Sequence, residues 1–206
     1  MDNLKTRLVV FDLETTNNPA KDYKHEIIEI AAVEIAGYRV NNNTFHSFVR
    51  PPCKIQPYNY RVSGISDDMV KDAPIIDRVL PELFDFIGND PLVGHNVAFD
   101  VRVLNEHLAG SGYDKMSNML LDTLILSRKI YKAEKTHNLD IVMQRLGIKP
   151  SHDKRHRALG DVECTAMVFL KFLDILKQYN ITTLEDIDRL CNTKCSIEDS
   201  QQIQLF

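Results

Sequence analysis

The first fifty residues show the apolar runs that are typical of β-strands. Runs rich in β-branched and aromatic residues occupy residues 7–14, 26–36 and 44–49, and each ends at a polar, glycine or proline break. Bounded runs of this kind predict three strands. The asparagine cluster at residues 41–43 favours a turn, so we expect the second and third strands to form a hairpin.

The later part of the chain alternates short apolar runs with helical spacing. Apolar residues form a helical stripe from Val97 to Leu108, which predicts a helix that ends near Gly110. Further helices are expected over 72–87, about 123–131, 137–146 and 158–178, with a short one capped by Thr182 and Glu185. Short buried strands are expected at 91–94 and 120–122. This order indicates an α/β domain with a mixed sheet.

Composition narrows the class of protein without identifying a function. The 206 residues are 44% hydrophobic and 26% charged, and the formal net charge is −4. These values are typical of a globular chain and exclude a disordered, fibrous or strongly polycationic protein. The apolar runs are far shorter than the ~18 residues that a membrane span needs. The four cysteines form no paired framework and the N-terminus does not resemble a signal peptide, so we expect a cytoplasmic protein.

Charge is unevenly distributed along the chain. Residues 128–157 hold nine lysines and arginines against three acidic residues, whereas residues 181–206 are acidic overall. A basic stretch on an acidic protein suits a phosphate-bearing ligand that touches one face. A solvated helical surface explains the same stretch equally well, so charge alone leaves both interpretations open.

Two carboxylates near the end of the first predicted strand are the first sign of chemistry. Side chains alternate along a strand, so Asp12 and Glu14 point to one face, about 6.5–7 Å apart. Val9, Phe11 and Leu13 point the other way, into a core. Paired carboxylates repel one another unless a cation lies between them, and hard oxygen ligands favour Mg²⁺ or Mn²⁺. Taken alone, the pair is better explained as a solvated strand face.

Three further polar residues change that weighting. Asp100 and Asp161 each fall in the first turn of a predicted helix, where the helix N-terminus stabilises an ionised carboxylate. His156 precedes Asp161 by five residues, within the basic stretch. Each residue alone has a structural explanation. Together they form an ordered signature: Asp12-x-Glu14, then Asn96-x-x-Phe99-Asp100, then His156-x-Ala158-x-x-Asp161.

This signature closely resembles that of the DEDDh exonucleases, and among them the proofreading (epsilon) subunit family of bacterial DNA polymerase III. Supporting segments are Thr15-Thr16, Ile27–Ile30 and Ser63–Ile65, and the resemblance covers roughly residues 6–178. It implies a ribonuclease H-like fold with a five-stranded mixed sheet flanked by helices. His156 indicates the histidine subfamily, because the sister subfamily carries Tyr-x-x-x-Asp at the last motif.

The resemblance also implies the chemistry of the site. Asp12, Glu14, Asp100 and Asp161 would hold two divalent cations, Mg²⁺ or Mn²⁺, with Asp12 bridging both. By the same resemblance, Glu14 and Asp161 hold the cation that activates water, and Asp100 supports the second. His156 would take a proton from that water. The expected reaction is 3′→5′ removal of nucleoside 5′-monophosphates from DNA 3′ ends, in proofreading or repair.

The substrate pocket and the substrate itself are less sharply defined. By resemblance, Thr15, Ser63, His95 and Asn96 line the terminal-nucleotide pocket, although relatives often carry His where this chain has Ser63. One alternative is a 3′→5′ exoribonuclease of the oligoribonuclease or ribonuclease T kind, which differs in its treatment of the 2′-hydroxyl. The other is an inactive nucleic-acid-binding module, which the presence of all four carboxylates and the histidine disfavours.

Residues 202–206 resemble the pentapeptide Gln-Leu-x-Leu-Phe by which bacterial polymerases and repair proteins bind the sliding clamp. The hydrogen-bonding head is Gln202, and the apolar anchors are Ile203, Leu205 and Phe206. A short apolar cluster that folds back onto the domain is the alternative. We therefore expect an exonuclease domain over 1–180, then a short helix, a flexible linker and a clamp-binding peptide over 181–206. The expected partners are DNA, a DNA polymerase and the sliding clamp.

Overall fold

The computed structural model describes residues 6–109, 111–149, 157–194, 196 and 197, built around one mixed sheet. The strands are β1 (Leu8–Asn18), β2 (Lys24–Ala36), β3 (Arg39–Phe48), β4 (Leu92–Gly94) and β5 (Leu120–Asp122). Their order in the sheet is β3-β2-β1-β4-β5. β1 pairs antiparallel with β2 and β2 with β3, whereas β4 runs parallel to β1 and β5 to β4. The predicted five-stranded mixed sheet is confirmed.

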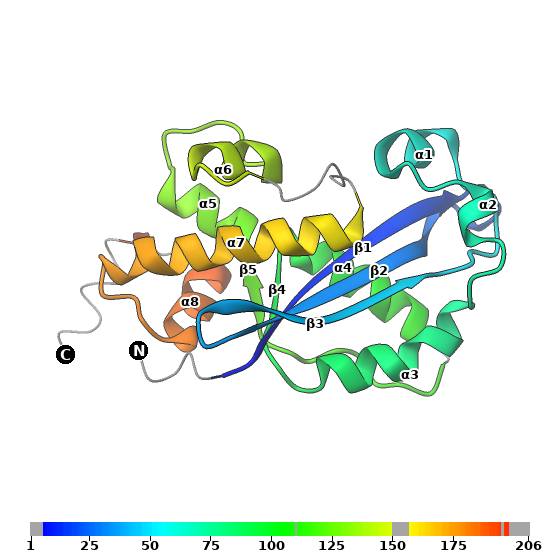
Figure 1. Cartoon of the computed structure of the whole chain (residues 1–206), viewed down its shortest axis with the longest axis horizontal. Helices are drawn as coiled ribbons and strands as arrows, with labels where there is room; N and C mark the ends of the chain where they lie inside the picture. The colour runs from blue at the N-terminus through cyan, green and yellow to red at the C-terminus, as the bar shows by residue number, and fades with distance from the viewer. Residues whose placement is uncertain (1–5, 110, 150–156, 195, 198–206) are drawn as a thin grey trace.

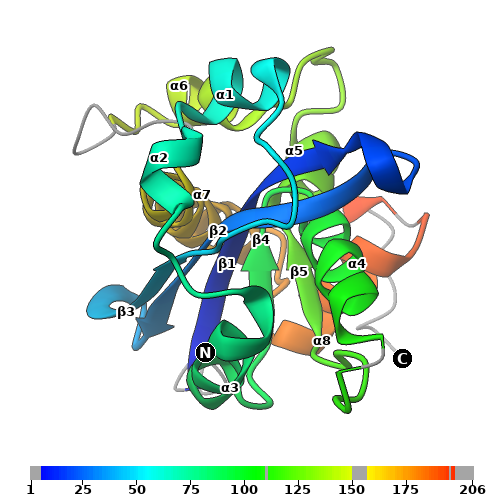
Figure 2. The ribbon, with the colours of Figure 1, turned by 90° about the vertical axis from the view of Figure 1, so that its right-hand side faces the viewer.

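Helices cover both faces of the sheet (Figure 1). Figure 2 shows α7 (Ala158–Lys177) on one face and α4 (Val97–Leu108) on the other, with α3 (Ile76–Ile87) below. The other helices are α1 (Pro57–Ser63), α2 (Asp67–Val70), α5 (Thr123–Ile130), α6 (Leu139–Arg145) and α8 (Leu184–Asn192), and a 3₁₀ turn, η2, spans Pro19–Lys21. Among the residues described, no helix combines the length and the apolar character that crossing a bilayer requires.

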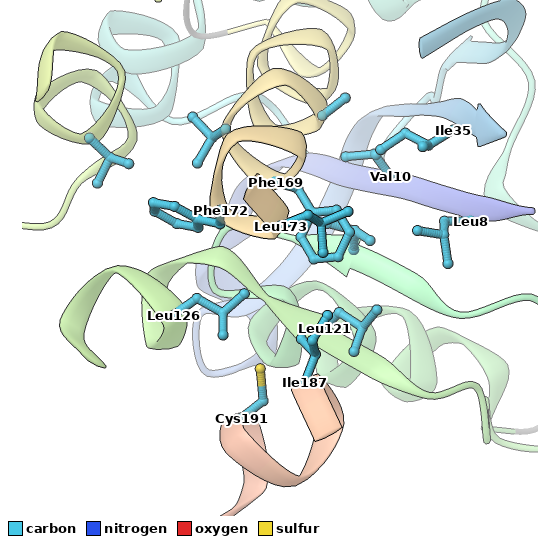
Figure 3. Packing of buried hydrophobic residues seen from close by; sticks show 14 of the residues in the cluster. Leu8, Val10, Ile35, Leu121, Leu126, Phe169, Phe172, Leu173, Ile187 and Cys191 are labelled. Atoms are coloured by element: carbon cyan, nitrogen blue, oxygen red, sulfur yellow. The ribbon is translucent and has the colours of Figure 1, made fainter. Parts of the chain in front are cut away.

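The alternation of side chains along β1 builds a separate hydrophobic core on each face. Val10 belongs to the core beneath α7 and α8, together with Phe169. Figure 3 shows this core, in which side chains of α7 and α8 meet those of β1, β2 and β5. The predicted core positions Val9, Phe11 and Leu13 all lie in the other core, against α3 and α4. Their placement confirms the predicted alternation, which leaves Asp12 and Glu14 on the face of α7.

The hairpin between β2 and β3 is confirmed, but its predicted turn was wrong. The chain reverses at Gly37 and Tyr38, whose φ angles are 58° and 63°. Two consecutive positive φ angles are what a two-residue type I′ turn requires. The asparagine cluster lies inside β3 instead, where Asn41 and Asn43 donate side-chain hydrogen bonds to Glu34 of β2. Those asparagines are accommodated in the strand because β2 offers them an acceptor.

β1 continues beyond its predicted end at Glu14. The strand passes through a β-bulge between Glu14 and Thr15 and then pairs with the start of β2. Bulges bend a strand and re-aim its side chains, often beside active sites. In the extension, Thr16 Oγ1 and Asn17 N both donate to Asn59 Oδ1 of α1, at 3.5 and 3.4 Å. The extra strand residues therefore hold α1 in place.

The observed helix boundaries agree less well with the predicted ones than the boundaries of the central strands do. α3 begins at Ile76 rather than at residue 72, and α1 and α2 are additional to the predicted helices. α8 is capped by Thr183, not by Thr182. Thr183 has extended backbone angles, and its Oγ1 accepts a hydrogen bond from Asp186 N at 3.1 Å. The cap therefore lies one residue later than predicted.

Candidate active site

Three carboxylates meet where β1 passes the start of α7. Asp12 and Glu14 lie on β1, and Asp161 lies in the first turn of α7. Each offers an oxygen that lies within 4.8 Å of those of the other two. All three side chains belong to half-buried residues. A group made only of carboxylate oxygens suits a hard divalent cation such as Mg²⁺ or Mn²⁺.

Asp100 brings a fourth carboxylate from α4. Its Oδ1 accepts a hydrogen bond at 3.3 Å from the backbone nitrogen of Leu13, the residue between Asp12 and Glu14. Only 5% of Asp100 is exposed to solvent. Its charge is the strongest of the neighbouring charges that raise the pKa of Asp12. The fold thus gathers all four predicted acidic residues around one segment of β1.

Burial and mutual repulsion oppose the charged forms of these carboxyls. Desolvation and then the charges of Asp100, Glu14 and Asp161 raise the pKa of Asp12 well above its usual range. Burial, followed by the charge of Asp161, raises the pKa of Glu14 to about 8. Burial also raises the pKa of Asp100 to about 8, although the backbone hydrogen bond from Leu13 opposes the shift. A bound cation would compensate the repulsion that these shifts express.

These shifts predict how stability depends on pH in the metal-free protein. A carboxyl with a raised pKa in the fold binds protons more tightly folded than unfolded, so its contribution is complete below about pH 4.5. That contribution is lost as pH rises through the folded pKa of about 8 for Glu14. In EDTA at pH 8.5, we expect Glu14→Gln to raise the free energy of unfolding by about 2 kcal/mol, or roughly 4–8 °C in Tm.

The measurement is the difference in Tm between wild type and Glu14→Gln from pH 5 to 8.5 in EDTA. Comparing the two proteins removes contributions from histidines, which titrate in the same window. Added Mg²⁺ should stabilise the wild type most at the high end of this range, because protons then compete least for the carboxylates. A difference in Tm that stays constant with pH would contradict the assignment.

Two of the predicted pocket residues are Thr15, on β1, and Ser63, the last residue of α1. Thr15 follows the β-bulge, with Oγ1 3.5 Å from Nδ1 of His25. Ser63 is buried at the end of α1, where its Oγ donates to Asn59 O at 3.0 Å and accepts from Ile65 N at 3.2 Å. Ser63 therefore closes the last turn of α1, which is a local structural role.

The other two pocket residues follow β4. His95 Nδ1 lies 2.9 Å from Thr123 Oγ1, and its Nε2 lies 2.9 Å from His137 O. Since a carbonyl only accepts hydrogen bonds, Nε2 carries the hydrogen in the second contact. Asn96 has a left-handed backbone, with φ of 74°, and an exposed side chain. Asn96 is thus open to a ligand, whereas His95 ties β4 to the segment before α6.

The predicted general base and the predicted docking peptide lie outside the described residues. These are His156 and the peptide residues Gln202, Ile203, Leu205 and Phe206. Arg157, the residue directly after the histidine, is described and leads into α7. Their roles therefore stay predictions from the sequence.

Two buried acidic residues near the site, Asp122 and Glu29, have structural roles that the sequence did not reveal, although Glu29 lies in the supporting segment Ile27–Ile30. Asp122, at the end of β5, accepts hydrogen bonds from Asn96 N at 3.0 Å and Leu124 N at 2.8 Å, and so joins the starts of α4 and α5. Glu29 interrupts the apolar run of β2 and is fully buried. A charged residue inside an apolar run is the available signal, because a buried charge requires partners.

Comparisons with known proteins agree with this geometry. A family model described as Exonuclease (RNase_T) matches residues 9–169. A DNA polymerase III PolC-type of Caldanaerobacter subterraneus subsp. tengcongensis is 37% identical over 186 residues, covering 90% of this chain and 13% of that protein. A DNA polymerase III subunit epsilon-like protein of Rhodobacter capsulatus is 40% identical over 183 residues, covering 87% of this chain and 25% of that protein. The chain thus spans about an eighth to a quarter of these relatives.

Solved structures share the fold. Exonuclease X in complex with 5′ overhanging duplex DNA superposes with a TM-score of 0.72 at 24% identity, covering 90% of this chain and 99% of that one. The nuclease domain of 3′hExo, a DEDDh family member bound to rAMP, superposes with a TM-score of 0.72 at 20% identity, covering 83% and 93%. The ribonuclease H-like exonuclease architecture expected from the signature is confirmed.

Proposed function

This chain belongs to the exonuclease family whose model covers residues 9–169, and we propose that it is a metal-dependent 3′→5′ exonuclease acting on DNA. The observation that carries this proposal is the convergence of Asp12, Glu14 and Asp161 within 4.8 Å, with Asp100 hydrogen-bonded beside them. Four carboxylates that repel one another in a partly buried site suit an enzyme that binds divalent cations there, because the cations would offset the repulsion. The products would be nucleoside 5′-monophosphates.

Each residue of the proposed site has a defined task. Asp12, Glu14, Asp100 and Asp161 hold two divalent cations, Mg²⁺ or Mn²⁺, through oxygen ligands alone. When bound, such cations lower the pKa of water and stabilise charge on phosphate oxygens. His156 accepts the proton of the attacking water, a task that suits an imidazole that is neutral near pH 7.

We propose DNA rather than RNA as the main substrate on the basis of the names of the relatives. Both curated relatives above carry DNA polymerase III in their names, and Exonuclease X was solved with duplex DNA. The basic stretch at 128–157 would contact the backbone of the strand. RNA is the second candidate, since 3′hExo was solved with rAMP. A cytoplasmic location and a role in proofreading or repair accompany the DNA proposal.

One assay compares the two substrates and tests the reaction. Single-stranded DNA, a mismatched primer–template and an RNA oligomer, each 5′-labelled, are incubated with the protein and Mg²⁺. The proposal expects product ladders that shorten from the 3′ end, fastest on DNA, and complete inhibition by EDTA. Faster shortening of RNA would favour the second candidate, and an absence of shortening on all three would contradict the exonuclease proposal.

The docking peptide would keep such an enzyme at its substrate. Ile203, Leu205 and Phe206 supply apolar anchors and Gln202 a hydrogen-bonding head for a sliding clamp. A peptide of this size binds weakly, but attachment to a clamp on DNA raises its effective concentration toward ~1 mM for a short flexible linker. A DNA polymerase is a further proposed partner, since both curated relatives carry that name.

Deleting residues 202–206 is expected to abolish clamp binding while the rate on short free oligonucleotides changes by less than about twofold. The apolar anchors are lost, whereas the carboxylate site is untouched. Binding is measured by surface-plasmon titration of a bacterial sliding clamp, with the pair of substitutions Leu205→Ala and Phe206→Ala as the matched variant. Equal binding by full-length and truncated protein would rule out this docking role.

A further inference from the structure

Glu29 is a buried carboxylate beside the proposed site that the proposed mechanism leaves without a task. It lies in the middle of β2, its side chain is fully shielded from solvent, and its cross-strand partner in β1 is Glu14. Its charge is among the causes that raise the pKa of both Asp12 and Glu14. A buried charge that opposes the neighbouring charges needs strong partners of its own.

Those partners come from the start of α7. Arg157 donates to both carboxylate oxygens of Glu29, with Nη2 2.7 Å from Oε1 and Nε 3.1 Å from Oε2. The backbone nitrogen of Ala158 donates to Oε2 at 3.0 Å. On the β3 side, His46 Nε2 lies 2.7 Å from Oε1. Burial raises the pKa of Glu29, but hydrogen bonds from His46, Arg157 and Ala158 outweigh it and lower the pKa to about 2.

Arg157 is fixed by more than its charge. Its guanidinium carbon lies 4.9 Å from the centre of the Phe48 ring, on β3. A planar fork that contacts both oxygens of a carboxylate and stacks on an aromatic ring has one preferred orientation. The backbone of Arg157 is therefore anchored to β2 and β3 directly before α7 begins.

The anchored residue is bonded to a proposed metal ligand. The backbone nitrogen of Asp161 donates to Arg157 O at 3.0 Å, which forms the first turn of α7. A shift of Arg157 would therefore move Asp161 relative to Asp12 and Glu14. In the sequence, Arg157 also directly follows His156.

We propose that Glu29 and Arg157 act as a positioning pair, which fixes the start of α7 so that Asp161 meets Asp12 and Glu14. The pair rests on the proposed exonuclease function for its effect on rate, but not for its effect on structure. Neither residue needs to touch substrate or cation. A misplacement of about 1 Å at a reacting group can cost roughly 100-fold in rate. Loss of the pair is therefore expected to lower the rate strongly.

Two substitutions separate positioning from a simple effect of charge. Glu29→Gln removes a negative charge near the carboxylates, whereas Arg157→Ala removes a positive one. If the pair acts only through its field, the two substitutions should shift the Mg²⁺ requirement in opposite directions. If it positions Asp161, both should lower kcat by roughly 10–100-fold, with KM changed less than about twofold. The double variant should be no slower than the slower single variant.

Arg157→Lys refines this test. Lysine keeps the positive charge but cannot reproduce the planar two-nitrogen contact with Glu29. We expect kcat of Arg157→Lys to exceed that of Arg157→Ala by less than about threefold. Full recovery would show that charge alone matters and would overturn the positioning role.

The chain offers a matched control at the opposite end of β2. There Arg7 Nε donates to Glu34 Oε2 at 2.8 Å, and its guanidinium lies 5.0 Å from the centre of the Phe86 ring. Arg7→Ala removes the same kind of contact far from the carboxylates. It should lower Tm by an amount similar to Arg157→Ala and leave kcat within about twofold of wild type.

Hydrogen–deuterium exchange tests the structural part without any assay of activity. We expect Arg157→Ala and Glu29→Gln to raise amide exchange at residues 158–163 by roughly tenfold, and Arg7→Ala to leave that segment unchanged. If the wild type cleaves no nucleic acid, the proposed function fails, and the exchange result still decides the pair. Unchanged exchange at 158–163, or unchanged kcat in an active enzyme, would overturn the inference.

Discussion

Replacing Asp12 with alanine is expected to lower the rate of nucleotide release by roughly three orders of magnitude or more. Asp12 shares the cluster with Glu14 and Asp161, and the charge of Asp100 bears on it as well. We expect no other described carboxylate to take its place, because the backbone of β1 fixes where the Asp12 side chain lies. Asp161→Ala should reduce the rate in the same way. The measurement is single-turnover cleavage of 5′-labelled single-stranded DNA with Mg²⁺.

The loss of rate should occur without loss of the fold. Removing one of several partly buried, mutually repelling carboxylates relieves repulsion, so Tm in EDTA should not fall. Glu185→Ala is the matched control for Asp161→Ala, because Glu185 is also an acidic residue in the first turn of a helix but is exposed on α8. Near wild-type rates for Asp12→Ala in the same preparation would show that the site is wrongly assigned.

The sequence predicts best the elements whose apolar pattern is long and regular. The stripe from Val97 to Leu108 coincides with α4, which ends slightly before the expected limit near Gly110, and the run from 26 to 36 falls within β2. The alternation along β1 also predicts that Asp12 and Glu14 share a face, because a strand leaves no other choice. In these elements, local preference and burial act in the same direction.

Short elements escape prediction because contacts from distant residues stabilise them. α1 has only seven residues, and its position depends on Asn59, which accepts hydrogen bonds from the end of β1. The backbone nitrogen of Gln56, just before α1, likewise donates to Thr16 Oγ1 at 2.9 Å. The pattern of residues 57–63 carries no record of these partners. The turn at Gly37 was missed for a related reason, because the acceptor of the Asn41 and Asn43 amides is Glu34, on the neighbouring strand.

The same distinction between local pattern and distant contacts applies to the site. The identity of its carboxylates follows from a signature in the sequence, but the arrangement that aligns them does not. Glu29 and Arg157 are 128 positions apart, and neither belongs to a local pattern that names the other. Similarly, the hydrogen bond from the backbone nitrogen of Asn96 to Asp122 depends on β4 and β5 lying side by side. The clustered carboxylates are therefore identified by the signature, whereas the residues that orient them are visible only in the fold.

His156→Ala is expected to lower kcat by roughly 10²–10⁴-fold, the usual contribution of a general base. His156 lies outside the described residues, directly before Arg157. Its proposed role therefore rests on the sequence signature. Affinity for the cation should change little, since the four carboxylates remain. In the wild type, the rate should fall as pH drops through the titration of the histidine, because the protonated ring cannot accept the proton of water.

The decisive measurement is the single-turnover rate from pH 5.5 to 8 at saturating Mg²⁺, for wild type, His156→Ala and His152→Ala. His152 is the matched control, because it is a histidine only four residues earlier in the sequence. Its replacement should preserve both the rate and the pH profile, whereas His156→Ala should remove the histidine-dependent limb of the profile. Added imidazole should restore part of the rate of His156→Ala by accepting the proton from solution. A wild-type profile that is flat over this range, with chemistry rate-limiting, would exclude His156 as the base.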